Sequence, residues 1–311
     1  MEKVKYSVVV AAYNEEEVLP AFFDRVTSIF DTLKEPYEII AVNDGSRDRT
    51  EDILRERCLA DKRIKAVNLS RNFGQQAALL CGLKESRGDA VIVMDADLQD
   101  PPEVALMMIE KWKDGYDVVH ARRKSRPGES FFKRSTAKMF YRFAHRISNP
   151  KVPENTGDFK LYSRRATDVL IALPETNRYL KAQSAWVGFK QTFVDFDRPA
   201  REAGETKYNL NKLVKLATDG LISNSTYPLT LSFKFGIIAC FLSIAAFLTF
   251  IILAICGIAL PLAAWLIPTA VLLFGVSWSL KGISDVYTAH IYEEVKNRPV
   301  YVIKDKFNDQ L

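Results

Sequence analysis

The first 120 residues alternate short apolar runs with longer amphipathic segments. The apolar runs lie at 6–12, 37–43, 64–69, 89–95 and 117–120. Polar turn residues bound each run, a pattern typical of strands that are buried on both faces of a sheet. The intervening segments at 16–33, 50–59, 75–85 and 101–114 are expected to be helices. Strands alternating with helices predict an α/β fold with a mainly parallel sheet.

The pattern is looser beyond residue 120. A basic helix is expected at 129–148, and strands are expected at 158–163 and 189–197. Residues 209–223 have an amphipathic helical pattern. The apolar side of that helix could pack on the folded core or lie at a membrane surface.

A long uncharged segment follows. Residues 235–280 contain no Asp, Glu, Lys, Arg or His, and they are bracketed by Lys234 and Lys281. Because one span needs about 20 apolar residues, this segment is long enough for two, with a turn near Gly257 and Pro261. The sequence therefore predicts a two-helix transmembrane hairpin, and the alternative is a buried helical hairpin in a soluble protein.

The net charge of +5 is concentrated in one region. Residues 122–146 hold nine Lys and Arg against a single acid, Glu129. A local positive field of this size favours an anionic partner such as a phosphate, a phospholipid headgroup or nucleic acid. The four cysteines form no C-x-x-C pair, which argues against a zinc site or a disulfide framework.

The clearest chemical motif follows the run 89–95. Asp95 and Asp97 lie two residues apart at the expected end of a strand, in the string DADLQDPP. Two such carboxylates can bind one hard cation, Mg²⁺ or Mn²⁺, which would in turn hold a diphosphate. A solvated turn before the helix at Pro101 is the alternative interpretation.

Three other expected strand ends also carry polar groups. The first has Tyr13 and Glu15, the second Asp44 in the string NDGS, and the third Gly74 in the string SRNFG. An aromatic ring can stack on a base, and a carboxylate can accept hydrogen bonds from a ribose or a base edge. Because open α/β sheets bind ligands at the carboxyl ends of their strands, four such ends in order predict a nucleotide site.

The strings AYNEEE, NDGS, SRNFGQQAAL and MDADLQDPPE resemble those of the GT-A glycosyltransferases of family 2. The similarity is greatest to the polyprenyl-phosphate glycosyltransferases, which are relatives of dolichol-phosphate mannose synthase, and it covers nearly the whole chain. One departure is Ala11, where the family usually has proline. The resemblance implies an inverting transfer of a sugar from a nucleotide donor to a lipid phosphate.

The resemblance also implies roles for individual residues. The nucleotide-sugar contacts that it implies are Ala11, Tyr13, Glu15, Asp44, Gly74, Asp95 and Ala96. The metal ligands that it implies are Asp95, Asp97 and Gln99, and the cofactor is Mg²⁺ or Mn²⁺. Asp158, in the string GDF, matches an acid near the acceptor, so the catalytic set is Asp95, Asp97 and Asp158.

By the same resemblance, the basic region would bind the acceptor phosphate. The candidates are Arg122, Lys133, Arg134 and Ser135, followed by Arg201 and Lys207. Arg123, Lys124 and Arg126 are instead interpreted as a solvated or lipid-facing basic surface. Binding of an acceptor phosphate would thereby account for the positive charge of this region without nucleic acid.

Four regions are expected along the chain. They are a cytosolic GT-A catalytic domain at 1–205, amphipathic interfacial helices at 206–233, a transmembrane hairpin at 234–283 and a cytoplasmic tail at 284–311. The expected location is therefore the inner or plasma membrane, with the catalytic domain in the cytoplasm. The expected partners are a nucleotide-sugar donor, undecaprenyl or another polyprenyl phosphate, membrane lipids and further copies of the chain.

Several alternatives remain open. Glucose from UDP-glucose is the expected donor, with mannose, N-acetylglucosamine and amino-arabinose as the other possible sugars. A polysaccharide synthase of the same fold would carry a Q-x-x-R-W string, and the nearest match here, Gln183 to Trp186, lacks the arginine. A membrane scaffold that senses nucleotide sugars is the candidate from another class. A dehydrogenase is disfavoured because no G-x-G-x-x-G follows any expected strand.

Overall fold

The computed structural model describes residues 3–123, 153, 156–176, 178–197 and 294–308, together with isolated positions between 249 and 292. The chain forms two compact units. The first contains Met1–Lys212 and Arg298–Leu311, and the second contains Leu213–Asn297. The helices expected at 129–148 and 209–223 lie outside the described residues.

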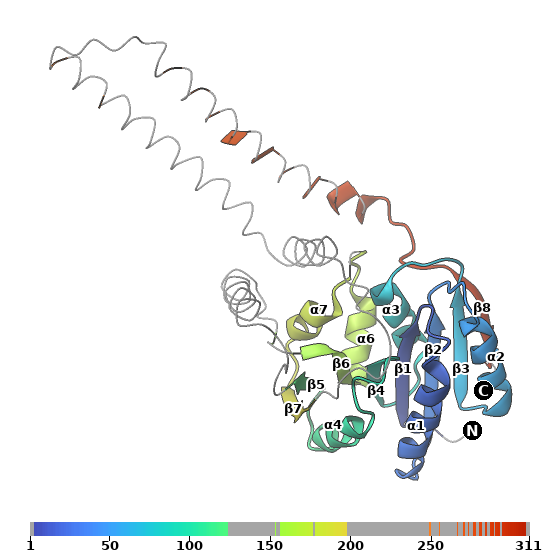
Figure 1. Cartoon of the computed structure of the whole chain (residues 1–311). Helices are drawn as coiled ribbons and strands as arrows, with labels where there is room; N and C mark the ends of the chain where they lie inside the picture. Colours follow the sequence, from blue (N-terminus) through green and yellow to red (C-terminus); the bar gives the residue numbers. More distant parts are fainter. Residues whose placement is uncertain are drawn as a thin grey trace. The chain divides into compact units, whose positions relative to one another are not determined.

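One eight-stranded sheet organises the first unit (Figure 1). Its strands are β1 (Tyr6–Ala12), β2 (Tyr37–Asn43), β3 (Ile64–Leu69), β4 (Ala90–Asp95), β5 (Val118–Arg123), β6 (Thr156–Ser163), β7 (Gln191–Phe196) and β8 (Ile303–Phe307). Their order across the sheet is β7-β5-β6-β4-β1-β2-β3-β8. The strands expected from the sequence are thereby confirmed, and β8 is added to them.

Four helices of the first unit match the expected segments closely, namely α1 (Leu19–Asp31), α2 (Thr50–Ala60), α3 (Gln75–Glu85) and α4 (Glu103–Lys113). Two further helices, α6 (Arg164–Ala172) and α7 (Leu180–Trp186), were not expected from the sequence. Helix α1 begins three residues later than the pattern predicts, with Pro20 in its first turn. Proline is favoured there because the first turn of a helix needs no donor at that position.

The sheet is mixed, so the expectation of a mainly parallel sheet needs qualification. Strands β1 to β4 are parallel to one another, but β6 runs antiparallel between β4 and β5. Strand β8 is antiparallel to β3 at the edge. An apolar run shows that a strand is buried, but it carries no information about the direction in which the strand enters the sheet.

Both faces of the central strands are buried in apolar clusters. Val8 and Val10 of β1 pack with residues of α1, α2 and α4, whereas Val9 between them packs with residues of α3 and α6. Successive side chains of a strand point to opposite faces, so a strand between two helical layers must be apolar at every position. The continuous apolar runs follow from this three-layer arrangement.

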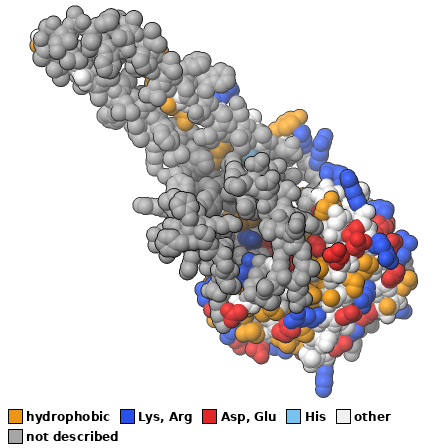
Figure 2. Space-filling model, in the orientation of Figure 1, with side chains coloured by type: hydrophobic (Ala, Val, Ile, Leu, Met, Phe, Trp, Pro, Cys, Tyr) orange, Lys and Arg blue, Asp and Glu red, His pale blue; other side chains and the backbone are white. Residues whose placement is uncertain are grey.

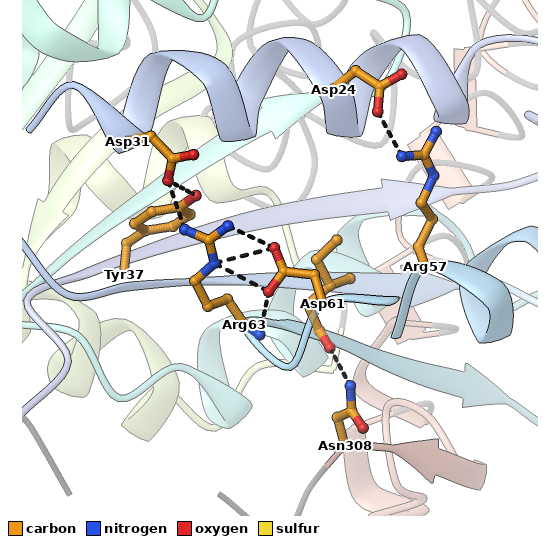
Figure 3. A network of polar contacts seen from close by, with 8 residues as sticks. Asp24, Asp31, Tyr37, Arg57, Asp61, Arg63 and Asn308 are labelled. Atoms are coloured by element: carbon orange, nitrogen blue, oxygen red, sulfur yellow. Dashed lines mark hydrogen bonds and ion pairs between the residues drawn. The ribbon is translucent and has the colours of Figure 1, made fainter. Parts of the chain in front are cut away.

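The last strand brings the end of the chain back to the sheet. Asn308, just after β8, donates from its side-chain nitrogen to the carbonyl oxygens of Cys58 and Ile64, beyond the pairing of β8 with β3. The same region holds a charged network in which Arg63 bridges Asp31 and Asp61 (Figure 3). The part of the expected cytoplasmic tail at 303–307 is thus a strand of the eight-stranded sheet.

The prediction of an integral membrane protein is corrected here. Among the residues that the structure describes, no helix is both long enough and apolar enough to cross a membrane. The structure therefore gives no support to the transmembrane hairpin at 234–283 or to a location in the inner or plasma membrane. An uncharged run in a sequence establishes low polarity, which by itself fixes neither a spanning helix nor its surroundings. Most of residues 234–283 lie outside the described part of the chain.

Candidate active site

The predicted nucleotide residues meet at one edge of the sheet. Ala12 of β1 is aligned with Asn43 of β2, which is aligned with Asn68 of β3. On the other side of β1, Ala11 is aligned with Asp95 of β4. The four parallel strands therefore end side by side, and the loops that follow them form one continuous polar edge, as the sequence predicts.

The loop after β1 is held by the loop after β2. Asn14 has a φ of 55°, a left-handed conformation that is uncommon outside glycine. Its backbone N–H donates to Ser46 Oγ at 3.0 Å, and its Oδ1 accepts from the Arg47 N–H at 2.9 Å. The N–H of Glu15 donates to Thr50 Oγ1 at 3.0 Å. Tyr13 remains 39% exposed, so its ring is accessible to a ligand.

Asp44 ties the loop after β2 to the loop after β3. Its two carboxylate oxygens accept from the backbone N–H groups of Phe73 at 2.7 Å and Gly74 at 2.9 Å. The side chain is buried, and desolvation raises its pKa despite these two bonds. At Gly45 a Cβ atom would lie 2.4 Å from the backbone carbon of Arg71, so only glycine allows the two loops to approach this closely. Asp44 thus organises the loops around the predicted nucleotide site.

Four acids gather at the ends of β4 and β6. Burial raises the pKa of Asp95, and the neighbouring charges of Asp100, Asp158 and Asp97 raise it further. Gln75 donates to Asp95 Oδ1 at 2.9 Å. Like charges held this close disfavour one another, so the group would be stabilised by a cation. Asp95, Asp97 and Asp158, the predicted catalytic residues, therefore belong to one electrostatic cluster.

A tight turn fixes the second predicted metal ligand. Leu98 has a φ of 53°, and the N–H of Gln99 donates to Asp97 Oδ1 at 3.1 Å. The side chains of Gln99 and Ala96 are buried at this turn. The turn ends at Asp100, which is 1% exposed. A carboxylate buried to this extent needs a positive charge nearby to offset its loss of hydration.

Three basic side chains lie near the acids, and the sequence interpretation assigned none of them to the site. Arg123 Nη2 lies 3.6 Å from Asp100 Oδ1, so the assignment of Arg123 to a solvated surface is wrong. Lys160 is fully buried and donates to Ser184 Oγ at 2.6 Å. Lys181 of α7 interacts electrostatically with Asp95. Burial lowers the pKa of Lys160 to about 7, and the charge of Asp158 opposes this shift.

One signal for Lys160 was available in the sequence. Residues two apart on a strand share a face, so Asp158 and Lys160 of β6 had to point the same way. No such signal existed for Lys181, because α7 reaches the site only through the tertiary fold.

The predicted metal residues are suitable ligands for a hard cation but do not form a complete site by themselves. In the described part of the chain, no group of three His, Cys, Asp or Glu side chains is placed to hold a metal ion. Two carboxylates and the Gln99 carboxamide offer oxygen ligands, and the repulsion that raises the pKa of Asp95 would be relieved by a dication. Mg²⁺ and Mn²⁺ sites of this kind take their remaining ligands from substrate phosphates and water.

Of the predicted acceptor residues, the structure describes only Arg122. Its guanidinium forms a two-point ion pair with Asp195 of β7, at 2.6 and 3.0 Å, and lies over the ring of Phe193. The remaining candidates lie outside the described residues, namely Lys133, Arg134, Ser135, Arg201 and Lys207. On the face that Figure 2 shows, acidic and basic side chains are interspersed over the described part of the first unit.

The fold and the site define a class of protein. A mixed sheet between helical layers, with loops and acids at the carboxyl ends of its parallel strands, is a GT-A-like α/β fold. A model described as Glycosyl transferase family 2 matches residues 7–171. The chain belongs to this family and is a glycosyltransferase.

Individual relatives extend the similarity over nearly the whole chain. The chain is 43% identical to the uncharacterized glycosyltransferase YkcC of Bacillus subtilis (strain 168), with 98% of this chain and 94% of that protein covered. It is 40% identical to the SfII prophage-derived bactoprenol glucosyl transferase of Shigella flexneri, with 97% and 98% covered. Among solved structures, mannosyl-3-phosphoglycerate synthase from Rubrobacter xylanophilus has a TM-score of 0.51 at 16% identity, covering 70% of this chain and 72% of that one. That likeness shows the fold alone.

Proposed function

We propose that this chain transfers glucose from UDP-glucose to undecaprenyl phosphate or another polyprenyl phosphate, with inversion at the sugar carbon. The observation that carries the proposal is the 40% identity, over 97% of the chain, to a bactoprenol glucosyl transferase. The acid cluster supports it, because Asp95, Asp97 and Asp158 lie together beside the predicted nucleotide loops.

In this proposal the loops after β1 to β3 bind the nucleotide. Tyr13 offers an accessible ring for the base, and Glu15 a carboxylate for the ribose or base edge. The fixed backbone around Asp44 shapes the floor of the site. A left-handed backbone conformation persists only where the surrounding fold holds it, so the bond from Asn14 to Ser46 supports a preformed loop.

The acids hold the reacting end of the donor. Asp95, Asp97 and Gln99 would bind Mg²⁺ or Mn²⁺, which neutralises the charge that develops on the leaving diphosphate. A phosphate acceptor is already ionised at neutral pH, so the chain needs mainly to position it. Asp158 would orient the acceptor next to the sugar, and Lys160 and Lys181 would balance the charge of the acids.

Arg122 would bind the acceptor phosphate by exchanging partners. Its two-point contact with the Asp195 carboxylate has the geometry that a phosphate group also accepts. The acceptor would therefore compete with Asp195 for the guanidinium. Assembly of the chain into a homo-oligomer stays a prediction from the sequence.

A transfer assay tests the proposal. The purified chain is given undecaprenyl phosphate, Mg²⁺ or Mn²⁺, and radiolabelled UDP-glucose, with labelled donors of mannose, N-acetylglucosamine and amino-arabinose in parallel. We expect label from UDP-glucose to enter the lipid phase and chelation by EDTA to stop it. Transfer from another donor would refute glucose, and binding of a donor without transfer to any polyprenyl phosphate would refute the acceptor.

A further inference from the structure

A row of polar side chains crosses the sheet at the carboxyl ends of β2 and β3 and finishes on β8. Asn43, Asn68 and Asp305 are aligned partners on these three neighbouring strands, which Figure 1 shows side by side at one edge. Asn43 is 1% exposed and Asn68 is 0% exposed. Buried amides are costly unless their donors and acceptors are paired, so each member of the row depends on the next.

The hydrogen bonds in this row have one direction. Asp305 Oδ1 accepts from Asn68 Nδ2 at 2.5 Å, and Asn68 Oδ1 accepts from Asn43 Nδ2 at 2.9 Å. Asn43 Oδ1 then accepts from the backbone N–H of Ser46 at 3.0 Å. A carboxylate can only accept, so the Asp305 end fixes which way both amides face. The Asp305 carboxylate on β8 thereby sets the orientation of Asn43, whose Oδ1 faces the loop after β2 as an acceptor.

The row ends where the predicted nucleotide loops begin. Ser46 Oγ accepts from the N–H of Asn14 at 3.0 Å, and this bond helps to hold Asn14 in its left-handed conformation. Asn14 lies between Tyr13 and Glu15, the two predicted nucleotide contacts of the first loop. A change at Asp305 can therefore reach that loop through a continuous series of hydrogen bonds, of which the one between Asn43 and Asn68 is fully buried.

We propose that Asp305 is a positioning residue for the nucleotide half of the donor, acting through Asn68 and Asn43 on the loops at Ser46 and Asn14. The inference rests on the proposed function, since it assumes a nucleotide donor at these loops. Asp305 lies in the segment that returns to the sheet after the second unit, Leu213–Asn297. Nucleotide affinity would consequently depend on whether the C-terminal strand is docked.

Four variants of the full chain separate this role from a general loosening of β8. Asp305→Ala removes the acceptor, and Asn68→Asp places two carboxylates against each other. The double variant Asn68→Asp with Asp305→Asn restores one donor and one acceptor in the opposite places. Lys306→Ala is the control. Lys306 lies on the same strand as Asp305, and its replacement removes the 2.7 Å bond to Glu85 of α3 but leaves the polar row intact.

The first readout is hydrogen–deuterium exchange without nucleotide. We expect the peptide that contains Ser46 to exchange faster in Asp305→Ala and Asn68→Asp, and to return toward the wild-type rate in the double variant. Lys306→Ala should leave that peptide unchanged. Equal exchange in all variants, or the same increase in Lys306→Ala, would overturn the inference.

The second readout is the dissociation constant for UDP, measured by calorimetry. We expect Asp305→Ala to weaken UDP binding about two- to tenfold, the range that loss of one hydrogen bond gives, and Asn68→Asp to weaken it more. The double variant should recover most of the loss, with kcat for transfer little changed throughout. Wild-type binding with no change in any variant overturns the inference alone, whereas a wild-type chain that binds no UDP contradicts the proposed function as well.

Discussion

The acids at the two ends of the parallel strands differ in the side chains that surround them. At the amino end, Glu38 accepts from Ser7 Oγ at 2.6 Å, Lys65 Nζ at 2.8 Å and the Arg87 N–H at 2.7 Å. At the carboxyl end, Asp95 is surrounded by further acids, and its pKa is raised by burial and by their charges. At the amino end Glu38 is paired directly within the fold, whereas at the carboxyl end the repulsion among the acids still raises the pKa of Asp95 although Lys181 opposes it.

A second pair of residues repeats the contrast. Asp117, before β5, accepts from Ser163 Oγ and from two nitrogens of Arg165, and the bond to Arg165 holds its pKa below the ordinary value. Asp158 lies near the start of the antiparallel strand β6, which is at the carboxyl end of the parallel strands. Its buried Oδ1 accepts no hydrogen bond within the described residues. Acids at the amino end are therefore expected to support stability, and acids at the carboxyl end to support activity at some expense of stability.

The largest effect should follow from removing a carboxyl-end acid. Asp97→Ala takes away one of two predicted carboxylate ligands, so we expect transfer to fall by about 10³-fold, the order found when one electrostatic group at a reacting centre is removed. Asp114→Ala, which removes an exposed acid paired with Lys111, is the control and should leave transfer unchanged. Turnover of Asp97→Ala within about tenfold of wild type would show that this end of the sheet is not the reacting centre.

The next effect is on stability at the amino end. Glu38→Gln leaves the buried Lys65 without a counter-charge, so we expect the chain to lose about 3 kcal/mol and its first unit to melt roughly 6–12 °C lower. Replacing both members, with Glu38→Gln and Lys65→Met, should recover much of that loss because the uncompensated charge is gone. Thermal unfolding followed by circular dichroism checks both variants. An unchanged melting temperature in Glu38→Gln would contradict the expectation that acids at the amino end of the strands support stability.

A smaller effect of opposite sign is expected at Asp95. Its pKa is raised in the fold, so the folded state loses stability as the pH rises from the unfolded value toward the raised one. Asp95→Asn removes that charge and should raise the melting temperature of the metal-free chain at pH 8 by about 2–4 °C, while transfer falls. The gain should shrink as the pH is lowered toward about 4, where the wild-type carboxyl is increasingly protonated in both states.

Addition of Mn²⁺ gives the matching control for Asp95. The ion should stabilise the wild-type chain more than Asp95→Asn, because it binds a site with one more negative charge. Equal stabilisation of both proteins by Mn²⁺ would show that Asp95 is not a ligand of the metal.

The sequence predicts those parts of this arrangement that have a local pattern of apolar and polar residues, and it does not predict the parts that depend on distant residues. The runs at 6–12, 37–43 and 64–69 match β1, β2 and β3 residue for residue, since strands buried on both faces must be apolar throughout. Strand β8 was missed because it lies at the sheet edge and reads IKDKF, with charged residues between apolar ones. Such a pattern in a C-terminal tail gives no indication of a partner strand more than two hundred residues earlier.

The site divides in the same manner. Tyr13, Asp44, Asp95 and Asp97 could be predicted as site residues because each lies at or just after the end of a recognisable strand. Arg123 was misassigned because its partner Asp100 is reached only after β4 and β5 are placed in one sheet. The ion pair of Arg122 with Asp195 likewise depends on the parallel pairing of β5 and β7, which joins residues far apart in the chain.

The smallest effect concerns Asp117 and depends on pH. Because its folded pKa is lowered, chiefly by the bond to Arg165, its contribution to stability is present above the unfolded pKa and is lost as the pH falls through the folded value. Because Arg165 is largely exposed and its charge is screened by solvent, Asp117→Asn should destabilise the chain by only about 0.5–1 kcal/mol at pH 7, with the difference from wild type narrowing below about pH 4. Asp168→Asn, at an exposed acid paired with Arg164, should change stability little at any pH. Urea unfolding of the three proteins across this pH range distinguishes the outcomes: a difference that persists at low pH would mean that the Asp117 side chain acts through packing, and the contrast between the two sheet ends would then rest on Glu38 alone.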